Sequence, residues 1–200
     1  MGINERKQRQ KEEVRLSILT VARKMLNEEG WQSLSIRRIA EAIEYSIPVI
    51  YDHFENKEAL QLELTKEGFC LLAKQVQDAR VSVEQASAQI EKMALAYWDF
   101  AFSNKQYYQM MFGLGMPTCE TVKKIEEIKF FGEQVRGSIS ELIANSTKPE
   151  QDVHLKFYVF WSMLHGLISI NLEDRTASNC EMQQMVLMDS IQSFIKSIEA

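Results

Sequence analysis

Side chains that can bind phosphate are concentrated between Ser35 and Leu60. The hydroxyls of Ser35 and Tyr51 suit phosphate oxygens, and Lys57 with the backbone N–H groups that follow Asn56 can hold a further phosphate. The chain has no phosphate-cradling glycine loop, no nucleophile elbow, no HExxH and no CxxC, so it is not predicted to be an enzyme. The chemistry that this segment favours is therefore non-covalent binding to phosphates.

Three short helices, each with its own start signal, are predicted to position these side chains. Ser35 can cap the first helix, Ser46 the second and Asn56 the third. Pro48 falls in the first turn of the second helix, where a missing N–H costs little. The apolar face of the first helix follows the i, i+3, i+4, i+7 pattern: Ile36, Ile39, Ala40 and Ile43. Two short helices joined by a tight turn predict a helix-turn-helix, whose second helix enters the DNA major groove.

Four short stretches of this segment occur together in a known order: Leu34–Ala40 (LSIRRIA), Ile50-Tyr51, His53-Phe54 and Asn56–Leu60 (NKEAL). They resemble the DNA-binding signature of TetR-family transcriptional regulators. The resemblance covers roughly the first third of the chain. It implies a DNA-binding domain at residues 1–58 and a C-terminal ligand-binding and dimerisation domain at residues 59–200.

The resemblance also implies roles for individual residues. The expected DNA-binding set has backbone contacts from Ser35, Tyr51, His53 and Lys57, and base reading by Arg37, Ile47, Pro48, Val49 and Tyr51, with Ser46 beside them. Two of these residues have a structural alternative: Ser35 can be a plain helix cap, and His53 a structural hydrogen-bonding group.

Two positions depart from the family pattern. The turn between the two helices usually carries glycine, but Glu44-Tyr45 stands there. A non-glycine residue in a left-handed conformation costs roughly 1–2 kcal/mol, so a looser or differently shaped turn is expected. The second helix presents Ile47, Pro48 and Val49, which can touch thymine methyl groups but cannot form bidentate bonds, leaving Arg37 as the obvious guanine reader. Sequence preference with a substantial DNA-shape component is therefore expected.

Composition predicts an all-α globular protein. The 200 residues are 46% hydrophobic and 26% charged, which excludes a disordered chain. Eight Gly and three Pro leave few breaks, which favours long helices over a sheet with many turns. About nine helices are expected. Besides the three of the motif, with the third running to about Ala79, they are Arg6–Glu29, Ser82 to about Ser103, Tyr107–Phe112, Thr118 to about Asn145, Thr147–Asn171, and Ser178 to Lys196 or beyond.

The distribution of charge points to the same end of the chain as the motif. A formal net charge of −5 argues mildly against a general nucleic-acid binder. Residues 1–24, however, carry seven Lys or Arg against three Glu, a net of +4, whereas residues 59–200 carry 13 cations against 18 carboxylates, a net of −5. The positive charge therefore lies next to the predicted helix-turn-helix, although a basic arm can equally be a solvated tail.

Localisation follows from what the sequence lacks. No apolar run reaches about 18 residues, so no membrane span is predicted. The start, MGINERKQRQKEE, has no apolar signal core, so a cytoplasmic protein is expected. Cys70, Cys119 and Cys180 are odd in number and far apart, which indicates reduced thiols without a metal site. No cofactor is predicted.

The second half is rich in aromatic residues and Met, which can line a cavity or simply fill a helical core. The resemblance implies an inducer cavity here, and the candidate pocket residues are Met93, Tyr97, Trp98, Phe102, Tyr108, Met111, Phe112, Phe131, Trp161 and His165. The stretch Trp161-x-x-x-His165-Gly166 also resembles a C-terminal motif of one branch of these regulators.

The last two predicted helices are too apolar for burial on one side, which predicts a homodimer through a four-helix interface. The resulting hypothesis is a repressor that binds double-stranded palindromic operator DNA and is released by a small apolar or amphipathic effector. Two alternatives stay open: a helical small-molecule-binding protein or enzyme that uses the C-terminal pocket, and an adaptor that uses the helix-turn-helix to bind protein.

Overall fold

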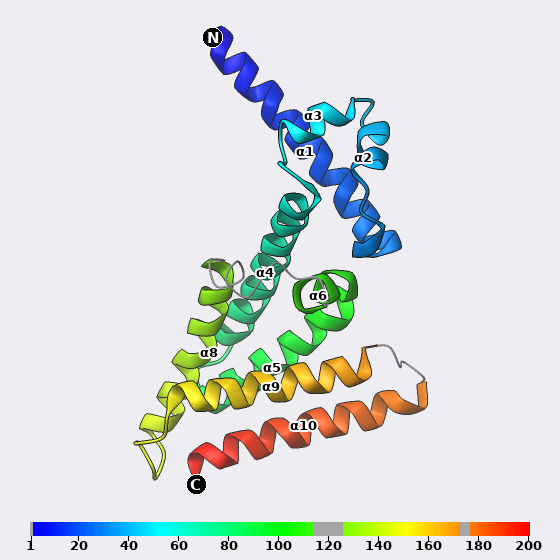
Figure 1. Ribbon diagram of the computed structural model, residues 1–200. Coiled ribbons are helices and arrows are strands. Elements are labelled where there is room, and N and C mark those ends of the chain that lie inside the picture. Colours follow the sequence, from blue (N-terminus) through cyan, green and yellow to red (C-terminus); the bar gives the residue numbers. More distant parts are fainter. Residues whose placement is uncertain (1, 114–125, 173–176) are drawn as a thin grey trace. The chain divides into compact units, whose positions relative to one another are not determined.

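The computed structural model describes residues 2–113, 126–172 and 177–200, and those ranges contain helices and no strand (Figure 1). This confirms the all-α prediction. The helices are α1 (Ile3–Glu29), the 3₁₀ helix η1 (Trp31–Ser33), α2 (Ile36–Ala42), α3 (Ile47–Tyr51), α4 (Lys57–Val81), α5 (Ala86–Ser103), α6 (Lys105–Phe112), α8 (Glu126–Ala144), α9 (Val153–Asn171) and α10 (Ala177–Glu199).

The chain divides into two compact units. The first comprises Met1–Gly68 and Gln106–Cys119, and the second comprises Phe69–Lys105 and Glu120–Ala200. The division cuts α4 after Gly68, so this one helix belongs to both units. The predicted roles of the two domains concern binding, which this division does not test. DNA binding by residues 1–58, and ligand binding and dimerisation by residues 59–200, therefore stay predictions.

In the first unit, α1 packs one apolar stripe into the core. Val14, Ile18, Ala22, Met25 and Leu26 are all buried. The helix ends at Gly30, whose N–H donates to the carbonyl of Leu26 at 3.0 Å. Gly30 has φ 88°, a conformation that favours glycine because it has no Cβ. Leu34, Ile50 and Phe54 are buried as well. Of the predicted apolar face of α2, Ile39 and Ala40 are buried, whereas Ile36 and Ile43 are only half-buried.

Ion pairs hold α1 against the first half of α4. Arg15 Nη2 lies 3.0 Å from Glu63 Oε1, and its guanidinium also lies over the ring of Phe54 at 5.2 Å from the centroid. About two helical turns further along α1, Arg23 Nε donates to both carboxylate oxygens of Glu67, at 2.8 and 2.9 Å. The hydroxyl of Tyr107 in α6 donates to the same carboxylate at 3.1 Å, so three helices of the first unit meet at Glu67.

Two predicted helix starts are wrong. Ser82 does not cap α5, because its hydroxyl donates back to the carbonyl of Ala79 at 2.7 Å and the helix begins at Ala86. Thr147 does not cap α9: its hydroxyl donates to Ala200 O at 2.5 Å. The carboxylate of Asp152 caps α9 instead, accepting from the N–H groups of His154 and Leu155 at 2.8 and 3.2 Å. The predicted cap Thr118 lies outside the described residues, as does the side chain of Ser178.

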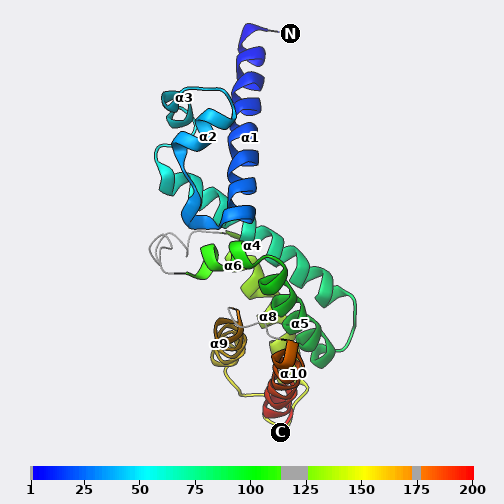
Figure 2. The same ribbon diagram turned by 90° about the vertical axis from the view of Figure 1, so that its right-hand side faces the viewer.

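In the second unit, α5, α8, α9 and α10 pack against one another, and α9 and α10 run side by side (Figures 1 and 2). Their shared core is apolar: Ile90, Met93, Tyr97, Phe100, Val135, Ile139, Phe160, Leu164, Ile168, Leu187, Ile191 and Ile198. A polar cluster between α4, α5 and α8 interrupts it. The buried hydroxyl of Ser138 donates to Gln89 Oε1 at 2.6 Å and accepts from Arg80 Nε at 3.1 Å, which ties α4, α5 and α8 together.

Helix α9 has two apolar faces. One face, with Phe157, Phe160, Leu164 and Ile168, is buried in the second unit. The other exposes Leu155 (60%), Tyr158 (58%) and Ile170 (76%). Among the described helices, α9 is long and apolar enough to cross a membrane, which is weak evidence for a span because a helix that packs on both sides has the same composition.

Candidate nucleic-acid interface

Helix α2 is positioned by its cap and by two buried side chains. Ser35 Oγ accepts a hydrogen bond from the N–H of Arg38 at 3.4 Å, so the cap predicted from the sequence is present. Ile39 and Ala40 face inward and are buried. Arg37 and Arg38 are thereby left on the exposed side of the helix.

The turn between α2 and α3 keeps the left-handed conformation in spite of its sequence. Glu44 has φ 60°, and its N–H donates to the carbonyl of Glu41 at 3.2 Å. The next N–H, of Tyr45, donates to the carbonyl of Ala40 at 3.0 Å. These two bonds form a Schellman motif, the usual way to end a helix at a left-handed residue. The turn is therefore not loosened: Glu44 adopts the left-handed conformation itself and takes a strain of about 1–2 kcal/mol that glycine would avoid.

Helix α3 presents a short exposed edge. Ile50 is fully buried and anchors the helix, while Ile47 (39%) and Tyr51 (49%) are exposed and lie one turn apart. Pro48 falls in the first turn, where backbone N–H groups have no acceptor within the helix, so its missing N–H removes no helical hydrogen bond. Ser46 is the N-cap residue of α3, as predicted, but its side chain makes no capping hydrogen bond. Pro48, two residues further on, already lacks one of the N–H groups that need an acceptor.

All nine residues of the predicted DNA-binding set lie in the first unit, and none of them is buried. The exposed members are Arg37, Ser46, Ile47, Pro48 and Tyr51, and the half-buried members are Ser35, Val49, His53 and Lys57. Lys57 is the first residue of α4, next to Asn56, whose side-chain oxygen accepts from the N–H of Ala59 at 2.7 Å and confirms the third predicted cap.

Arg37 is paired within its own helix. Its Nε donates to Glu41 Oε1 at 2.9 Å, and this hydrogen bond is the main cause that raises the pKa of Arg37. Both side chains are largely exposed, at 78% and 62%. An exposed ion pair of this kind is weak and is screened by salt, whereas a bidentate contact to guanine is strong, so Arg37 can leave Glu41 when a base is offered.

His53 lies in the turn that follows α3, where its N–H donates to the carbonyl of Ile50 at 3.0 Å. Its Nδ1 is buried and has no hydrogen-bond partner among the described residues. Burial lowers the pKa of His53, and the charges of Lys11 and Arg15 lower it further, against the opposing effect of Asp52 and Glu12. His53 is therefore neutral at pH 7.

A surface depression of about 470 Å³ lies beside His53. Its lining combines Asp52 and His53 with four residues of α1: Lys7, Gln10, Lys11 and Val14. The sequence did not assign these residues of α1 to the site, although the spacing of Lys7, Lys11 and Val14 at i, i+4 and i+7 already places them on one helical face.

The candidate pocket residues fall into both units. Tyr108, Met111 and Phe112 of α6 belong to the first unit, and the other seven belong to the second. Several of those seven are brought together: Trp161 Nε1 donates to the hydroxyl of Tyr97 at 3.1 Å, and the rings of Tyr97 and Phe131 are 5.6 Å apart. His165 lies next to Trp161, with ring centroids 6.4 Å apart, and burial lowers its pKa.

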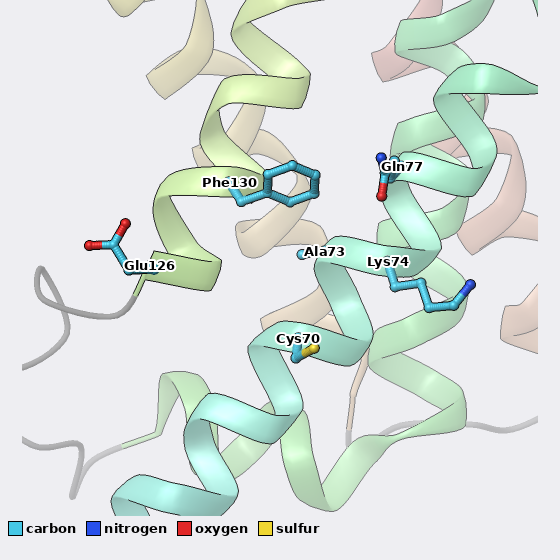
Figure 3. A pocket seen from close by; sticks show the side chains of 6 residues that line it. All are labelled: Cys70, Ala73, Lys74, Gln77, Glu126 and Phe130. Carbon is cyan, nitrogen blue, oxygen red and sulfur yellow. The ribbon is translucent and has the colours of Figure 1, made fainter.

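A different depression, of about 290 Å³, lies within the second unit (Figure 3). It is lined by Cys70, Ala73, Lys74 and Gln77 of α4 and by Glu126 and Phe130 of α8. None of the ten candidate pocket residues is part of this lining. Lys74 is bonded to Asp78 at 2.8 Å, so its charge is already balanced.

Comparison with known proteins identifies relatives for both halves of the chain. Residues 18–64 match the bacterial regulatory proteins of the tetR family, and residues 90–186 match the tetracyclin repressor-like C-terminal domain. An uncharacterized HTH-type transcriptional regulator of Bacillus subtilis, YobS, is 27% identical over 92 residues, which are 46% of this chain and 48% of that regulator. The match thus spans about half the length of this relative.

Solved structures with low sequence identity share the fold over nearly the whole chain. A protein of unknown function from Rhodococcus sp. RHA1 superimposes with a TM-score of 0.76 at 20% identity, covering 94% of this chain and 96% of that one. The transcriptional regulator FadR from Bacillus subtilis, solved in complex with stearoyl-CoA, gives a TM-score of 0.67 at 17% identity, covering 92% and 97%.

Proposed function

The chain belongs to the TetR family of DNA-binding transcriptional regulators, and we propose that it is a repressor whose homodimer binds a palindromic operator and is released by a small effector. The observation that carries the DNA-binding part is the set of exposed side chains on α2 and α3. Arg37, Ile47, Pro48 and Tyr51 all reach solvent from two adjoining short helices fixed by buried Ile39 and Ile50. We propose that the protein acts in the cytoplasm and has no catalytic role.

The proposed chemistry at the bases combines one polar reader with an apolar edge. Arg37 can form bidentate bonds to guanine O6 and N7. Ile47, Pro48 and the half-buried Val49 can contact thymine methyl groups only. The hydroxyls of Ser35, Ser46 and Tyr51, with Lys57, would bind backbone phosphates and set the register of α3 on the duplex.

The proposed dimer interface is the outer face of α9 and α10. Leu155, Tyr158 and Val159 are exposed at i, i+3 and i+4 on α9, and Met182, Met185 and Val186 repeat this spacing on α10. Gly166 lies on the same face of α9, and a Cβ built on it would meet no atom within 4 Å. Adjacent apolar stripes with a glycine in open space support close approach by the same two helices of a second copy.

The proposed effector site is the aromatic cluster of the second unit around Tyr97, Phe131, Trp161 and His165, to which Met93, Trp98 and Phe102 of the same unit would add. The neutral His165 and the tyrosine hydroxyl offer a few polar groups in an apolar lining, which suits an apolar or amphipathic molecule. Arg136 lies over the ring of Phe157 at 4.9 Å from the centroid, which places a cation at one side of this cluster and favours an effector with an anionic end. The FadR structure with stearoyl-CoA supports this choice, since that fold holds an amphipathic acyl compound.

Helix α4 is the proposed link between effector and DNA. It begins at Lys57 of the DNA-binding set and continues to Val81, whose neighbour Arg80 bonds to Ser138 and Gln134 of α8. An effector that binds more tightly to one position of α4 would shift the population toward that position and change DNA affinity. Glu67 is the point at which α1 and α6 hold this helix in the first unit.

The test is salt-dependent binding to a palindromic duplex selected from a random pool. Arg37→Ala should weaken binding to the selected duplex by about 10- to 100-fold, the effect of losing roughly 1–3 kcal/mol of base contact, and should weaken binding to unselected DNA much less. Arg38→Ala is the matched control, because it removes the same charge from a residue bonded to Glu29 at 2.6 and 2.7 Å. Equal losses for the two variants on both duplexes would contradict base reading by Arg37.

A further inference from the structure

Arg136 is a cation of the second unit that has no anionic partner. It lies on α8 and is half-buried, and none of the described residues accepts a hydrogen bond from it or forms an ion pair with it. Its contact is with α9, where the guanidinium carbon lies over the ring of Phe157 at 4.9 Å from the centroid. A ring face is at most a weak acceptor, so this contact leaves the N–H donors of the guanidinium without acceptors among the described residues.

Two other arginines show what such a side chain has elsewhere in the molecule. Arg15 also lies over an aromatic ring, at 5.2 Å from the centroid of Phe54, but its Nη2 pairs with Glu63 at 3.0 Å. Arg80, the other described arginine of the second unit, donates to two side-chain oxygens of α8 at 3.1 and 3.0 Å. Arg136 has the ring without the acceptor. Because a half-buried charge is only partly hydrated, an incoming anion would bind more strongly to it than to an exposed cation.

The position of Arg136 is built into two helices. Gly132, one turn earlier on α8, is buried, and a Cβ built on it would lie 2.7 Å from Nη1 and 3.2 Å from Cζ of Arg136. A side chain at position 132 would therefore displace the guanidinium. Phe157 supplies the aromatic face on α9, which attracts a cation. The glycine and the ring thus keep the guanidinium where α8 packs against α9.

Phe157 also connects Arg136 to the proposed effector site. Its ring is stacked on that of Trp161, with centroids 6.2 Å apart, and meets Phe131 edge-on at 6.5 Å. Phe131 in turn lies 5.6 Å from Tyr97. The cation therefore lies against the aromatic cluster itself, without a spacer. A ligand that packs on these rings would reach Arg136 with a group attached directly to its apolar body.

We propose that Arg136 binds the carboxylate of an organic acid in which this group is attached directly to an apolar body. This inference rests on the proposed function and narrows the effector from an apolar or amphipathic molecule to an apolar carboxylic acid. The planar guanidinium matches the two oxygens of a carboxylate with two parallel hydrogen bonds, which makes the contact selective as well as strong. A neutral molecule with the same apolar body would leave the donors of Arg136 unpaired and would bind more weakly.

The test compares two probes with the same chain, decanoate and its alcohol, decanol. Their dissociation constants for the full-length protein are measured near neutral pH by displacement of the uncharged fluorescent reporter N-phenylnaphthylamine. Wild type should bind decanoate about 10-fold more tightly than decanol. Arg136→Gln should reduce this ratio to about one by weakening the binding of decanoate alone, because only the acid uses the guanidinium.

Three further variants separate the position of the guanidinium from its charge. Gly132→Ala keeps every charge and favours the helix, but its methyl group would displace the guanidinium, so the preference for decanoate should fall while thermal stability is kept. Arg136→Lys keeps the charge and loses the paired hydrogen bonds, so a preference of about threefold should remain. Lys92→Gln is the control, because it removes an exposed cation of the same unit and should leave the preference at the wild-type level. If thermal unfolding shows that Arg136→Gln is not folded, the first two of these variants carry the test.

Equal affinities of wild type for the two probes, a preference that survives in Arg136→Gln, or the same loss in Lys92→Gln would overturn the Arg136 site. The proposed effector site would stand in each of these cases, provided that decanol displaces the reporter. A wild-type protein from which neither probe displaces the reporter would overturn the effector site together with this inference. The proposed DNA binding is tested separately, on the selected duplex.

Discussion

The first and second units differ in how their candidate functional residues are held. In the first unit the DNA-binding set is exposed or half-buried, and its members are positioned by residues close to them in sequence. Ser35 accepts a hydrogen bond from the N–H of Arg38, and Tyr51 follows Ile50, which is buried. In the second unit the pocket candidates contact one another across α5, α8 and α9, as Tyr97 does Trp161. Surface recognition of this kind is encoded locally, whereas a ligand site depends on packing between distant segments.

The largest expected effect is the loss of the proposed homodimer, which would lower the affinity for DNA. In Gly166→Leu the new side chain points into open space within one subunit, so the subunit should still fold. The leucine side chain would, however, block the proposed contact between the α9 helices of two subunits. Sedimentation should show a monomer, and affinity for the palindromic duplex should fall by about 100-fold because two linked heads are lost. Ser140→Leu, on the exposed side of α8, is the control. A dimer that persists in Gly166→Leu would place the interface elsewhere.

A second prediction concerns stability within the first unit. Glu44→Gly removes the left-handed strain at φ 60° and should raise the free energy of unfolding by about 0.5–1 kcal/mol, less than the full strain because glycine also gains freedom in the unfolded chain. Urea denaturation measures this change. Glu44→Ala loses the same charge but keeps the strained backbone, so it should stay near wild type; stabilisation equal to that of Glu44→Gly would show that charge, not backbone, is responsible.

A smaller effect sharpens the account of base reading. Glu41→Gln frees Arg37 from its ion pair and removes a negative charge near the DNA, so binding to the selected duplex should tighten about 2- to 5-fold. The comparison is Glu29→Gln, which frees Arg38 in the same way. Should Glu29→Gln tighten binding as much, general electrostatics would account for the gain.

The smallest effect is a pH dependence at His53. In the free protein burial and the charge of Lys11 lower the pKa of His53 below its ordinary value, and a bound phosphate would raise it. Complex formation then takes up a proton, so affinity should rise about twofold as pH falls from about 8 to about 6. Folding has the opposite sign: the lowered pKa contributes stability above the unfolded pKa that is lost as pH falls. Binding must therefore be compared with His53→Gln, which should lose the pH-dependent part.

The features that the sequence predicted correctly depend on short-range rules. The caps at Ser35 and Asn56 and the end of the first helix at Glu29 follow from neighbours one to four residues away. The cap predicted at Ser82 failed because its hydroxyl bonds back to the carbonyl of Ala79. The cap predicted at Thr147 failed because the carboxylate of Asp152 lies nearer the start of α9.

The geometry that the sequence missed arises between segments. The meeting of Lys11 with His53 joins residues 42 positions apart, and the hydrogen bond of Trp161 to Tyr97 joins residues 64 apart. Periodicity places each side chain on a face of its own helix, but it contains no information on which other helix that face meets.

A hydroxyl-radical footprint of the purified protein on the selected palindromic duplex tests the central claim most directly. Two exposed α3 edges, each anchored by a buried Ile50 and related by a two-fold axis, should protect two symmetric segments centred about one helical turn, roughly 34 Å, apart. A single protected segment, or no protection at low salt, would contradict recognition of DNA by a dimer of these heads.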